Sequence, residues 1–222
     1  PETVCFTGPP AHEHVHAWAG GSGTGPETLD HNRYLLNAPE PAILDAGAVD
    51  LAADYLMAGH RPGEHKILTP HAGELERFLR RIHEHSPQRW EEMLDGALVP
   101  SREDINAEPF RWVRAACELS GATVMLKGST TLIAAPVGAT YSVHGATGWL
   151  ATAGSGDTLT GILGALLAQY MAAAQERHEQ VEGCTYASLA ALAVYLHNRA
   201  ALASLEGRKG PVPPSREDAY LP

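Results

Sequence analysis

Cysteines and basic residues are scarce in this sequence, and no apolar run is long enough to cross a membrane. The three cysteines, Cys5, Cys117 and Cys184, are far apart and form no Cys-x-x-Cys unit, so we expect reduced, packed thiols in a cytoplasmic protein. With 16 Lys and Arg against 26 Asp and Glu, the net charge is -10, which argues against a sequence-independent nucleic-acid surface. The longest apolar stretch, Leu159 to Ala174, is interrupted by polar residues and glycines. It is shorter than the about 20 residues of a membrane span, so it predicts a buried core helix and no membrane partner.

The length and the apolar content are sufficient for one full core. Of the 222 residues, 44% are hydrophobic and 22 are glycine, a composition that suits a globular α/β protein. We find no internal repeat or linker, so residues 1–222 are expected to form one domain. No charged-then-apolar leader opens the chain, which predicts no signal peptide. The chain begins at Pro1 without a methionine, which indicates that an upstream portion is missing.

Short β-like runs alternate with amphipathic helical segments along the chain. This alternation predicts an α/β fold with a parallel sheet and helices on its faces. The expected strands are Val15 to Ala19, Ala42 to Leu44, Lys66 to Leu68 and Thr123 to Leu126, followed by an antiparallel hairpin of Thr131 to Ala135 and Thr140 to Val143. The expected helices are Val49 to Met57, the segment after His71, Phe110 to Leu119, the segment from Gly156, and Tyr186 to about Leu205.

The spacing of apolar residues predicts which helix faces are buried. The helix after His71 is expected to bury Leu75, Phe78, Leu79 and Ile82. The helix from Gly156 carries Leu159, Ile162, Leu163, Leu166, Leu167, Tyr170 and Met171 at helical spacing, and the last helix is expected to bury Leu189, Leu192, Ala193 and Leu196. Residues 84–105 are interpreted as a polar surface excursion with a short helix near Trp90, and the proline-rich tail from Pro211 is expected to lie over the surface.

The most informative segment is the glycine-rich turn that opens the helix at Gly156. Backbone N–H groups of Gly154 to Gly156 would approach an anion closely, and the helix dipole would add to the attraction. A phosphate bound there would have the Asp157 carboxylate beside it, placed to accept a proton from an attacking hydroxyl. The alternative is an ordinary helix start, with Asp157 in the first turn for local reasons alone.

Four further loops follow the carboxyl ends of expected strands, the edge where open α/β sheets bind ligands. They are Gly20 to Gly25, Asp45, the Thr69-Pro70-His71-Ala72-Gly73-Glu74 segment, and Lys127-Gly128-Ser129-Thr130-Thr131. Together with the turn before Asp157 they would line one crevice.

Each of these loops also has a simpler explanation. The glycine loop can be a flexible connector, and Lys127 can be merely solvated. Thr69 can cap a helix that has Pro70 in its first turn, and the negative charge of Glu74 would then interact favourably with the helix dipole. This explanation gives no role to His71. His12, His14 and His16 alternate in the manner of a metal site. No cysteine or placed carboxylate accompanies them, so we interpret them as solvated surface and predict no protein metal site.

Several of these segments together resemble one family. Ile67 to Glu74 resembles the TPHxGE motif of the ADP/ATP-dependent NAD(P)HX dehydratases, repair enzymes of the ribokinase-like superfamily. Leu44-Asp45-Ala46 is similar to their LDAD segment, Leu126 to Thr131 to their LKGxxT, and Trp149 to Gly161 to their MATGGTGDxLxG. The resemblance runs from about Trp18 to the end. It implies a ribokinase-like three-layer sandwich with a mostly parallel central sheet and helices on both faces.

The sequence departs from the family pattern in places. The family's GPGLG stands here as Gly21-Ser22-Gly23-Thr24-Gly25, and its LDADAL as Leu44-Asp45-Ala46-Gly47-Ala48-Val49. Residues 84–105 have no match, and the family's first strand–helix units have no counterpart. We therefore expect part of the substrate wall to be missing.

The resemblance implies a set of site residues. The nucleotide-binding residues are Lys127, Gly128, Ser129, Thr130, Thr131, Gly154 and Gly156. Gly23, His71 and Asp157 would contact the hydrated dinucleotide, with Asp157 also the catalytic base. Magnesium would be bound through the nucleotide phosphates.

The implied activity is that of a hydro-lyase. ADP or ATP would phosphorylate the hydroxyl of hydrated NADH or NADPH, and elimination of the phosphate would restore the reduced nicotinamide. We favour ADP as the donor and a homo-oligomer, with a tetramer suspected from the family and from the apolar faces of the last helix. Two alternatives remain: a ribokinase-like kinase acting on a small vitamin precursor, and a nucleotide-binding module without turnover.

Overall fold

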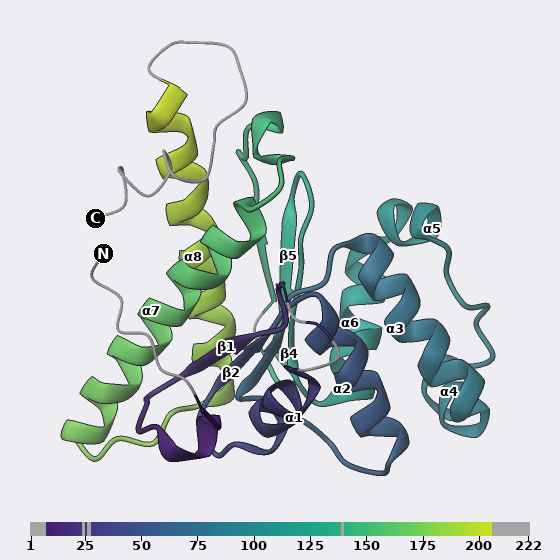
Figure 1. The fold of residues 1–222 in the computed structure, drawn as a ribbon. Helices are drawn as coiled ribbons and strands as arrows, with labels where there is room; N and C mark the ends of the chain where they lie inside the picture. The colour runs from purple at the N-terminus through teal and green to yellow at the C-terminus, as the bar shows by residue number, and fades with distance from the viewer. Residues whose placement is uncertain (1–7, 24, 26–27, 139, 206–222) are drawn as a thin grey trace.

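The computed structural model describes residues 8–23, 25, 28–138 and 140–205, and within them a six-stranded sheet forms the centre (Figure 1). The strands lie in chain order, and β1 to β4 are parallel while β5 and β6 are antiparallel. Their bounds are β1 Trp18–Gly20, β2 Ala42–Leu44, β3 Lys66–Leu68, β4 Thr123–Leu126, β5 Thr131–Ala134 and β6 Thr140–Val143.

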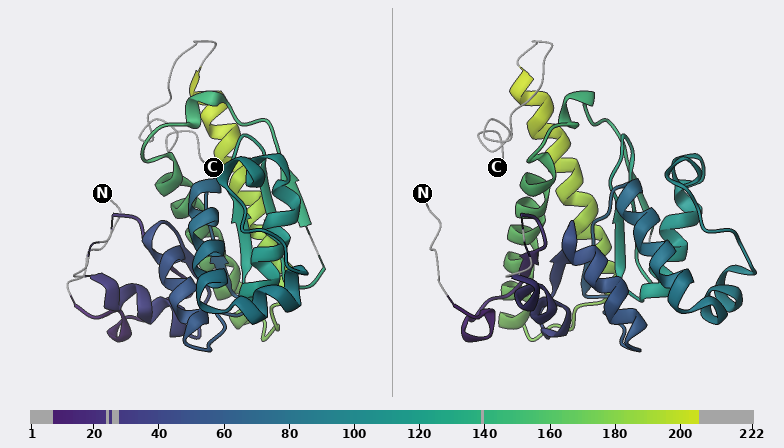
Figure 2. Two further views of the ribbon diagram at one scale, coloured as in Figure 1. Left: turned by 90° about the vertical axis from the view of Figure 1, so that its right-hand side faces the viewer. Right: turned by 45° about the vertical axis from the view of Figure 1, so that its right-hand side comes forward.

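Helices cover both faces of the sheet (Figures 1 and 2). One face carries α7 (Ser155–Glu176), which packs against β1 and β2, and α8 (Gly183–Leu205), which packs against β4, β5 and β6. The other face carries α1 Leu29–Asn37, α2 Gly47–Met57, α3 Ala72–His85 and α6 Pro109–Ser120, with α4 Pro87–Leu94 and α5 Arg102–Ala107 packed outside α3 and α6. Two short 3-10 helices, η1 Pro10–His12 and η3 Gly148–Leu150, complete the described elements.

Alternate residues of each strand enter two separate cores. Ile43, Ile67 and Met125 pack with α7 and α8, whereas their neighbours Leu44 and Leu68 pack with the helices of the opposite face. All five side chains are at most 1% exposed. Because both faces are covered, β2 to β5 are buried along their whole length, whereas the outer strands β1 and β6 are partly exposed. The expected α/β fold with a mostly parallel sheet and helices on both faces is confirmed.

Most expected elements are present with bounds shifted by a few residues. The first strand is the exception, because it begins at Trp18 and the prediction from Val15 is wrong over its first three residues. Residues 84–105 are more ordered than a surface excursion. Trp90 on α4 is only 2% exposed, with its Nε1 donating to the carbonyl O of Ala97 at 2.6 Å, and α5 was not expected.

The buried face of α8 differs from the expected one. Leu192 was expected to be buried, and it is 41% exposed. The face against the sheet and α7 is instead made mainly of small residues: Ala187, Ala190, Ala193, Val194, Ala200 and Ala201. Small side chains let the helix axis approach the sheet closely, so the leucines lie on the flanks and the outside.

Cys117 is a packed core residue, as expected for the cysteines. This thiol is fully buried, and burial raises its pKa to about 12. Cys117 and Cys184 are both free. The expectations for Cys5 and for the tail from Pro211 fall outside the described residues.

Lys66 is a fully buried lysine at the start of β3. Its Nζ donates hydrogen bonds to the carbonyl oxygens of Ala38 at 2.5 Å and Glu40 at 2.8 Å. Burial lowers the pKa of Lys66 from 10.5 to about 8, and the negative charge of Glu40 opposes this shift. Lys66 therefore joins β3 to the segment that leads into β2.

We predict that Lys66 makes folding stability rise with pH above neutrality. Because the pKa is lower in the folded than in the unfolded state, burying the charge costs free energy below pH 8, and this cost is relieved as pH approaches 10.5. Relative to Lys66→Met, wild-type stability should increase by about 2 kcal/mol between about pH 7.5 and 9.5. Urea unfolding of both proteins measures this difference. Parallel pH dependences would contradict the prediction.

Candidate functional site

Three strand ends meet at one buried carboxylate, that of Asp45. Its Oδ1 accepts hydrogen bonds from Thr69 Oγ1 at 2.8 Å and from Lys127 Nζ at 2.5 Å. Asp45 follows β2, Thr69 follows β3 and Lys127 follows β4. The Asp45 side chain is 5% exposed and that of Lys127 is 20% exposed. Lys127 is thus held by an ion pair, and the simpler reading of a solvated lysine is wrong.

His71 caps the N-terminus of α3. Its Nδ1 accepts from the backbone N–H groups of Gly73 at 3.1 Å and Glu74 at 3.2 Å, while Glu74 Oε2 accepts from the His71 N–H at 2.8 Å. This reciprocal capping box has His71 as N-cap, not Thr69. Nδ1 is thus the acceptor atom of this cap, and Nε2 on the other side of the ring lies 3.5 Å from Glu74 Oε1.

The N-terminus of α7 lies beside Lys127. Gly154 is the N-cap residue with φ of 91°, a conformation that favours glycine. A Cβ placed on Gly156 would lie 3.8 Å from Lys127 Nζ, so the first amides of α7 and the lysine face the same space. Between the two glycines, Ser155 Oγ lies 3.3 Å from Nε2 of His197 on α8.

A cavity of about 570 Å³ opens at this edge of the sheet, within the size range of small-molecule sites. One wall comes from the strand-end loops, another from α7 and α8, and a third from the segment around η3. Its lining includes these expected site residues: His71, Lys127, Gly128, Ser129, Thr131 and Gly156. Thr130, Gly154, Gly23 and Asp157 do not line it.

Asp157 faces the other side of the α7 N-terminus. Its carboxylate accepts a hydrogen bond from Ser22 Oγ in the glycine loop. Gly21 allows this loop to come close, because a Cβ there would lie 1.8 Å from the carbonyl O of Asp45 and φ is 113°. Asp157 and Ser22 are therefore brought together, with Gly23 next in the chain.

Several residues of the cavity were not expected from the sequence. Arg102 comes from α5, Thr147 and Ala151 from the segment around η3, and His197 and Asn198 from α8. Asn198 is 5% exposed, and its Nδ2 has no hydrogen-bond partner. The helical spacing of α8 does place Val194, His197 and Asn198 on one side, but only the packing of α8 against α7 shows that this side meets the cavity.

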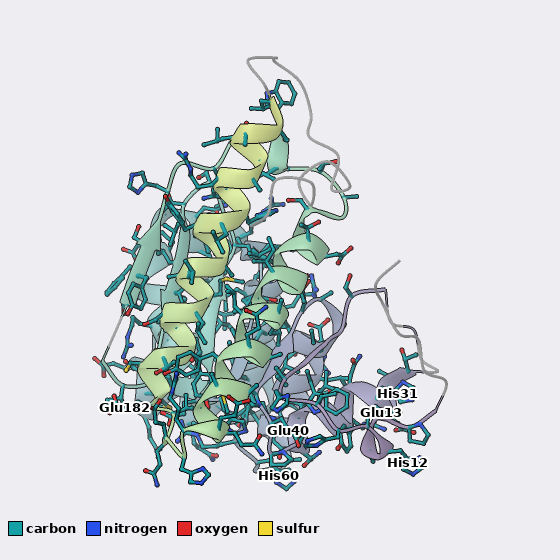
Figure 3. All side chains as sticks on the ribbon, turned by 90° about the vertical axis from the view of Figure 1, so that its left-hand side faces the viewer. His12, Glu13, His31, Glu40, His60 and Glu182 are labelled. Atoms are coloured by element: carbon teal, nitrogen blue, oxygen red, sulfur yellow. The ribbon has the colours of Figure 1, made fainter. Side chains whose placement is uncertain are left out.

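The histidine-rich segment near residue 12 lies elsewhere. Figure 3 shows His12, Glu13 and His31 at the lower edge of the molecule, far below the C-terminal end of α8. His14 and His16 stand before β1 rather than on it, with ring centroids 5.7 Å apart. Among the described residues, no three His, Cys, Asp or Glu side chains gather in a way that could hold a metal ion. No helix of the described part is long and apolar enough to span a membrane.

Comparison with known proteins agrees with this arrangement of motifs. A family model described as NAD(P)H-hydrate dehydratase matches residues 2–210. The chain belongs to the NAD(P)H-hydrate dehydratase family.

Two curated relatives illustrate the family. The chain is 36% identical over 172 residues to the bifunctional NAD(P)H-hydrate repair enzyme Nnr of Mycobacterium tuberculosis, covering 76% of this chain and 31% of that protein. It is 34% identical over 161 residues to the ADP-dependent (S)-NAD(P)H-hydrate dehydratase of Neisseria meningitidis, covering 70% of this chain and 48% of that protein. The chain thus spans about a third to a half of the length of the curated relatives it matches.

Solved structures of dehydratase-family and related proteins share the fold. The ADP/ATP-dependent NAD(P)H-hydrate dehydratase of Bacillus subtilis, co-crystallised with ATP and Mg2+, matches with a TM-score of 0.64 and 24% identity over 93% of this chain and 62% of that chain. A ribokinase-like superfamily protein of Enterococcus faecalis matches with a TM-score of 0.62 and 22% identity over 92% of this chain and 61% of that chain. The expected ribokinase-like fold is confirmed.

The cap on α3 generates a prediction for this family member. His71→Ala should lower the free energy of unfolding by about 1 kcal/mol, because two backbone N–H groups lose their acceptor. His71→Asn should stay close to wild type, since a short amide side chain supplies the same acceptor. Chemical denaturation at neutral pH measures both values. Equal stability of wild type and His71→Ala would show that the ring does not stabilise the helix start.

Proposed function

We propose that this protein catalyses the ADP-dependent dehydration of hydrated NADH and NADPH, with ATP as the alternative donor. The observation that carries the proposal is the cavity, where the Thr69 to Glu74 loop, the Lys127 loop and the α7 N-terminus come together. Family membership and the ADP dependence named for the Neisseria relative support the same reaction.

The cavity is the proposed nucleotide site. Phosphate oxygens would lie against Lys127, Gly128, Ser129 and the first amides of α7, where the helix dipole favours negative charge. The base would lie on the apolar wall of Leu159 and Val194. Thr130, Thr131 and Gly154 would complete the nucleotide-binding loops, with Thr131 in the lining of the cavity.

Asp157 is the proposed catalytic base, with Gly23 and His71 contacting the substrate. The nicotinamide hydroxyl attacks the terminal phosphorus, its proton passes to Asp157, and AMP leaves when ADP is the donor. Inorganic phosphate then leaves the ring carbon as the adjacent carbon loses a proton, which restores the double bond. The amides of Gly154 to Gly156 stabilise the charge on the transferred phosphoryl group.

Magnesium fits this site through the nucleotide. Among the described residues that line the cavity there is no Asp or Glu, so a protein cage for the ion is lacking there. Mg2+ commonly binds through substrate phosphates and water, and in that position it would neutralise phosphate charge.

Assembly is a further part of the proposal. Leu192, Tyr195 and Leu202 on α8 are 41%, 54% and 42% exposed, and we propose that this face contributes to a homo-oligomer, a tetramer by analogy with the family, in a cytoplasmic protein. Light scattering at micromolar concentration should give a mass above that of the monomer. A monomer under these conditions would contradict the assembly.

The reaction is tested by recovery of absorbance at the reduced-nicotinamide wavelength when hydrated NADH and ADP are added. Asp157→Asn should reduce this turnover by about 10²–10⁴-fold, because the amide keeps the shape but cannot accept the proton. Nucleotide affinity and the fold should remain nearly unchanged. Asp30→Asn, an equal charge change on the exposed face of α1, should keep full activity.

Three results would oppose the proposal in different ways. More than about a tenth of wild-type turnover in Asp157→Asn would remove this residue as the base. Phosphorylation of hydroxymethylpyrimidine or hydroxyethylthiazole without repair of hydrated NADH would favour a vitamin-precursor kinase. Binding of ADP without turnover in either assay would favour a binding module.

A further inference from the structure

Two basic side chains, Lys127 and Arg102, line the cavity. The charge of Lys127 is balanced, because its ammonium is paired with the buried carboxylate of Asp45 at 2.5 Å. A nucleoside diphosphate brings close to three negative charges, and the α7 N-terminus offsets only about half of one. Positive charge from the protein, in addition to that of the proposed Mg2+, would therefore strengthen binding.

Of these two basic side chains, Arg102 is the one that is not paired with a carboxylate in the described part of the chain. Within the described part of the chain, its guanidinium makes no ion pair or hydrogen bond. Asp104, in the same first turn of α5, is engaged by Ser101, whose N–H and Oγ donate to Asp104 Oδ2 at 2.9 and 2.7 Å. The side chain is exposed to the cavity mouth, where a ligand can reach it.

The backbone that carries Arg102 is held firmly. The Ser101–Asp104 capping box fixes the first turn of α5, and Ile105 in the next turn is fully buried. α5 packs against α3 and α6, and α3 begins at the capped His71, which also lines the cavity. An ordered backbone with an unpaired guanidinium suits the binding of an external anion, because the planar fork matches phosphate oxygens.

We propose that Arg102 binds a phosphate group of the nucleotide co-substrate in this cavity, supplying the positive charge that Lys127 shares with Asp45. This inference rests on the proposed nucleotide-dependent function. It assigns a role to residues 84–105, the segment that the family motifs leave unmatched. It also makes Arg102 the residue through which the site responds to the number of phosphates on the ligand.

The test is calorimetric titration of the complete chain with ADP, AMP and adenosine. Arg102→Gln should weaken ADP binding by at least about tenfold and leave adenosine binding unchanged, because adenosine carries no phosphate. Arg102→Lys should fall between Arg102→Gln and wild type. Arg33→Gln, the same charge change on the exposed surface of α1, should bind all three ligands as wild type does. The ADP affinity of wild type should also fall more steeply with salt than that of Arg102→Gln.

The outcomes separate this inference from the proposed function. Absence of ADP binding in wild type would overturn both. Wild-type binding that Arg102→Gln leaves intact would overturn only the role of Arg102. A parallel loss of ADP and adenosine affinity would show that Arg102 supports the fold rather than a phosphate. Intact ADP affinity of Arg102→Gln, together with weakened binding in a separate titration with NADPH, would place Arg102 on the dinucleotide and equally overturn the assignment.

Discussion

The buried carboxylate of Asp45 is the interaction on which this edge of the molecule depends. Thr69 and Lys127 donate to it from the ends of β3 and β4, and the backbone of Gly21 packs against its carbonyl oxygen. One residue thus fixes the relative positions of four loops. The adjacent Ala46 has φ of 44°, a conformation that a residue with a Cβ adopts only where its surroundings enforce it. Removing one partner of the Asp45–Lys127 pair leaves an uncompensated buried charge, so a substitution at either residue is expected to destabilise this edge of the sheet.

This arrangement also determines the charge of the cavity. Burying Asp45 requires a cation beside it, and Lys127 fills that role, so its charge is shared before any ligand enters. The residues left to attract phosphate are the first amides of α7 and the guanidinium of Arg102. In the proposed function, stability of the sheet edge and affinity for the nucleotide are therefore linked through one lysine. A substitution at Lys127 affects both, whereas one at Arg102 is expected to affect affinity alone.

Sequence patterns predicted the central strands and the position of the motif loops at the strand ends, because both depend on local chemistry. Buried parallel strands such as Ala42 to Leu44 are short apolar runs, and the loops after them carry the glycine and polar residues that ligand sites need. Features that depend on tertiary packing could not be predicted from the sequence. The outward position of Leu192 follows from the close approach of α8 to the sheet, and the presence of Arg102 in the cavity follows from how α5 packs on α3. His71 shows an intermediate case, since its motif was evident but its capping geometry was not.

The α7 N-terminus divides the site into two sides, and this division suits phosphoryl transfer. The cavity with Lys127 lies on one side, and Asp157 with Ser22 lies on the other. In the proposed reaction the transferred phosphoryl group sits at the helix end, the nucleotide leaves toward the cavity, and the hydroxyl approaches from the side of Asp157. Phosphoryl transfer requires attacking and leaving oxygens roughly in line, and entry of the two reactants from different sides of the helix end would allow this. Gly154 determines how this helix begins, because its φ of 91° is a conformation that glycine adopts without strain, and the proposed phosphoryl site lies at that helix start.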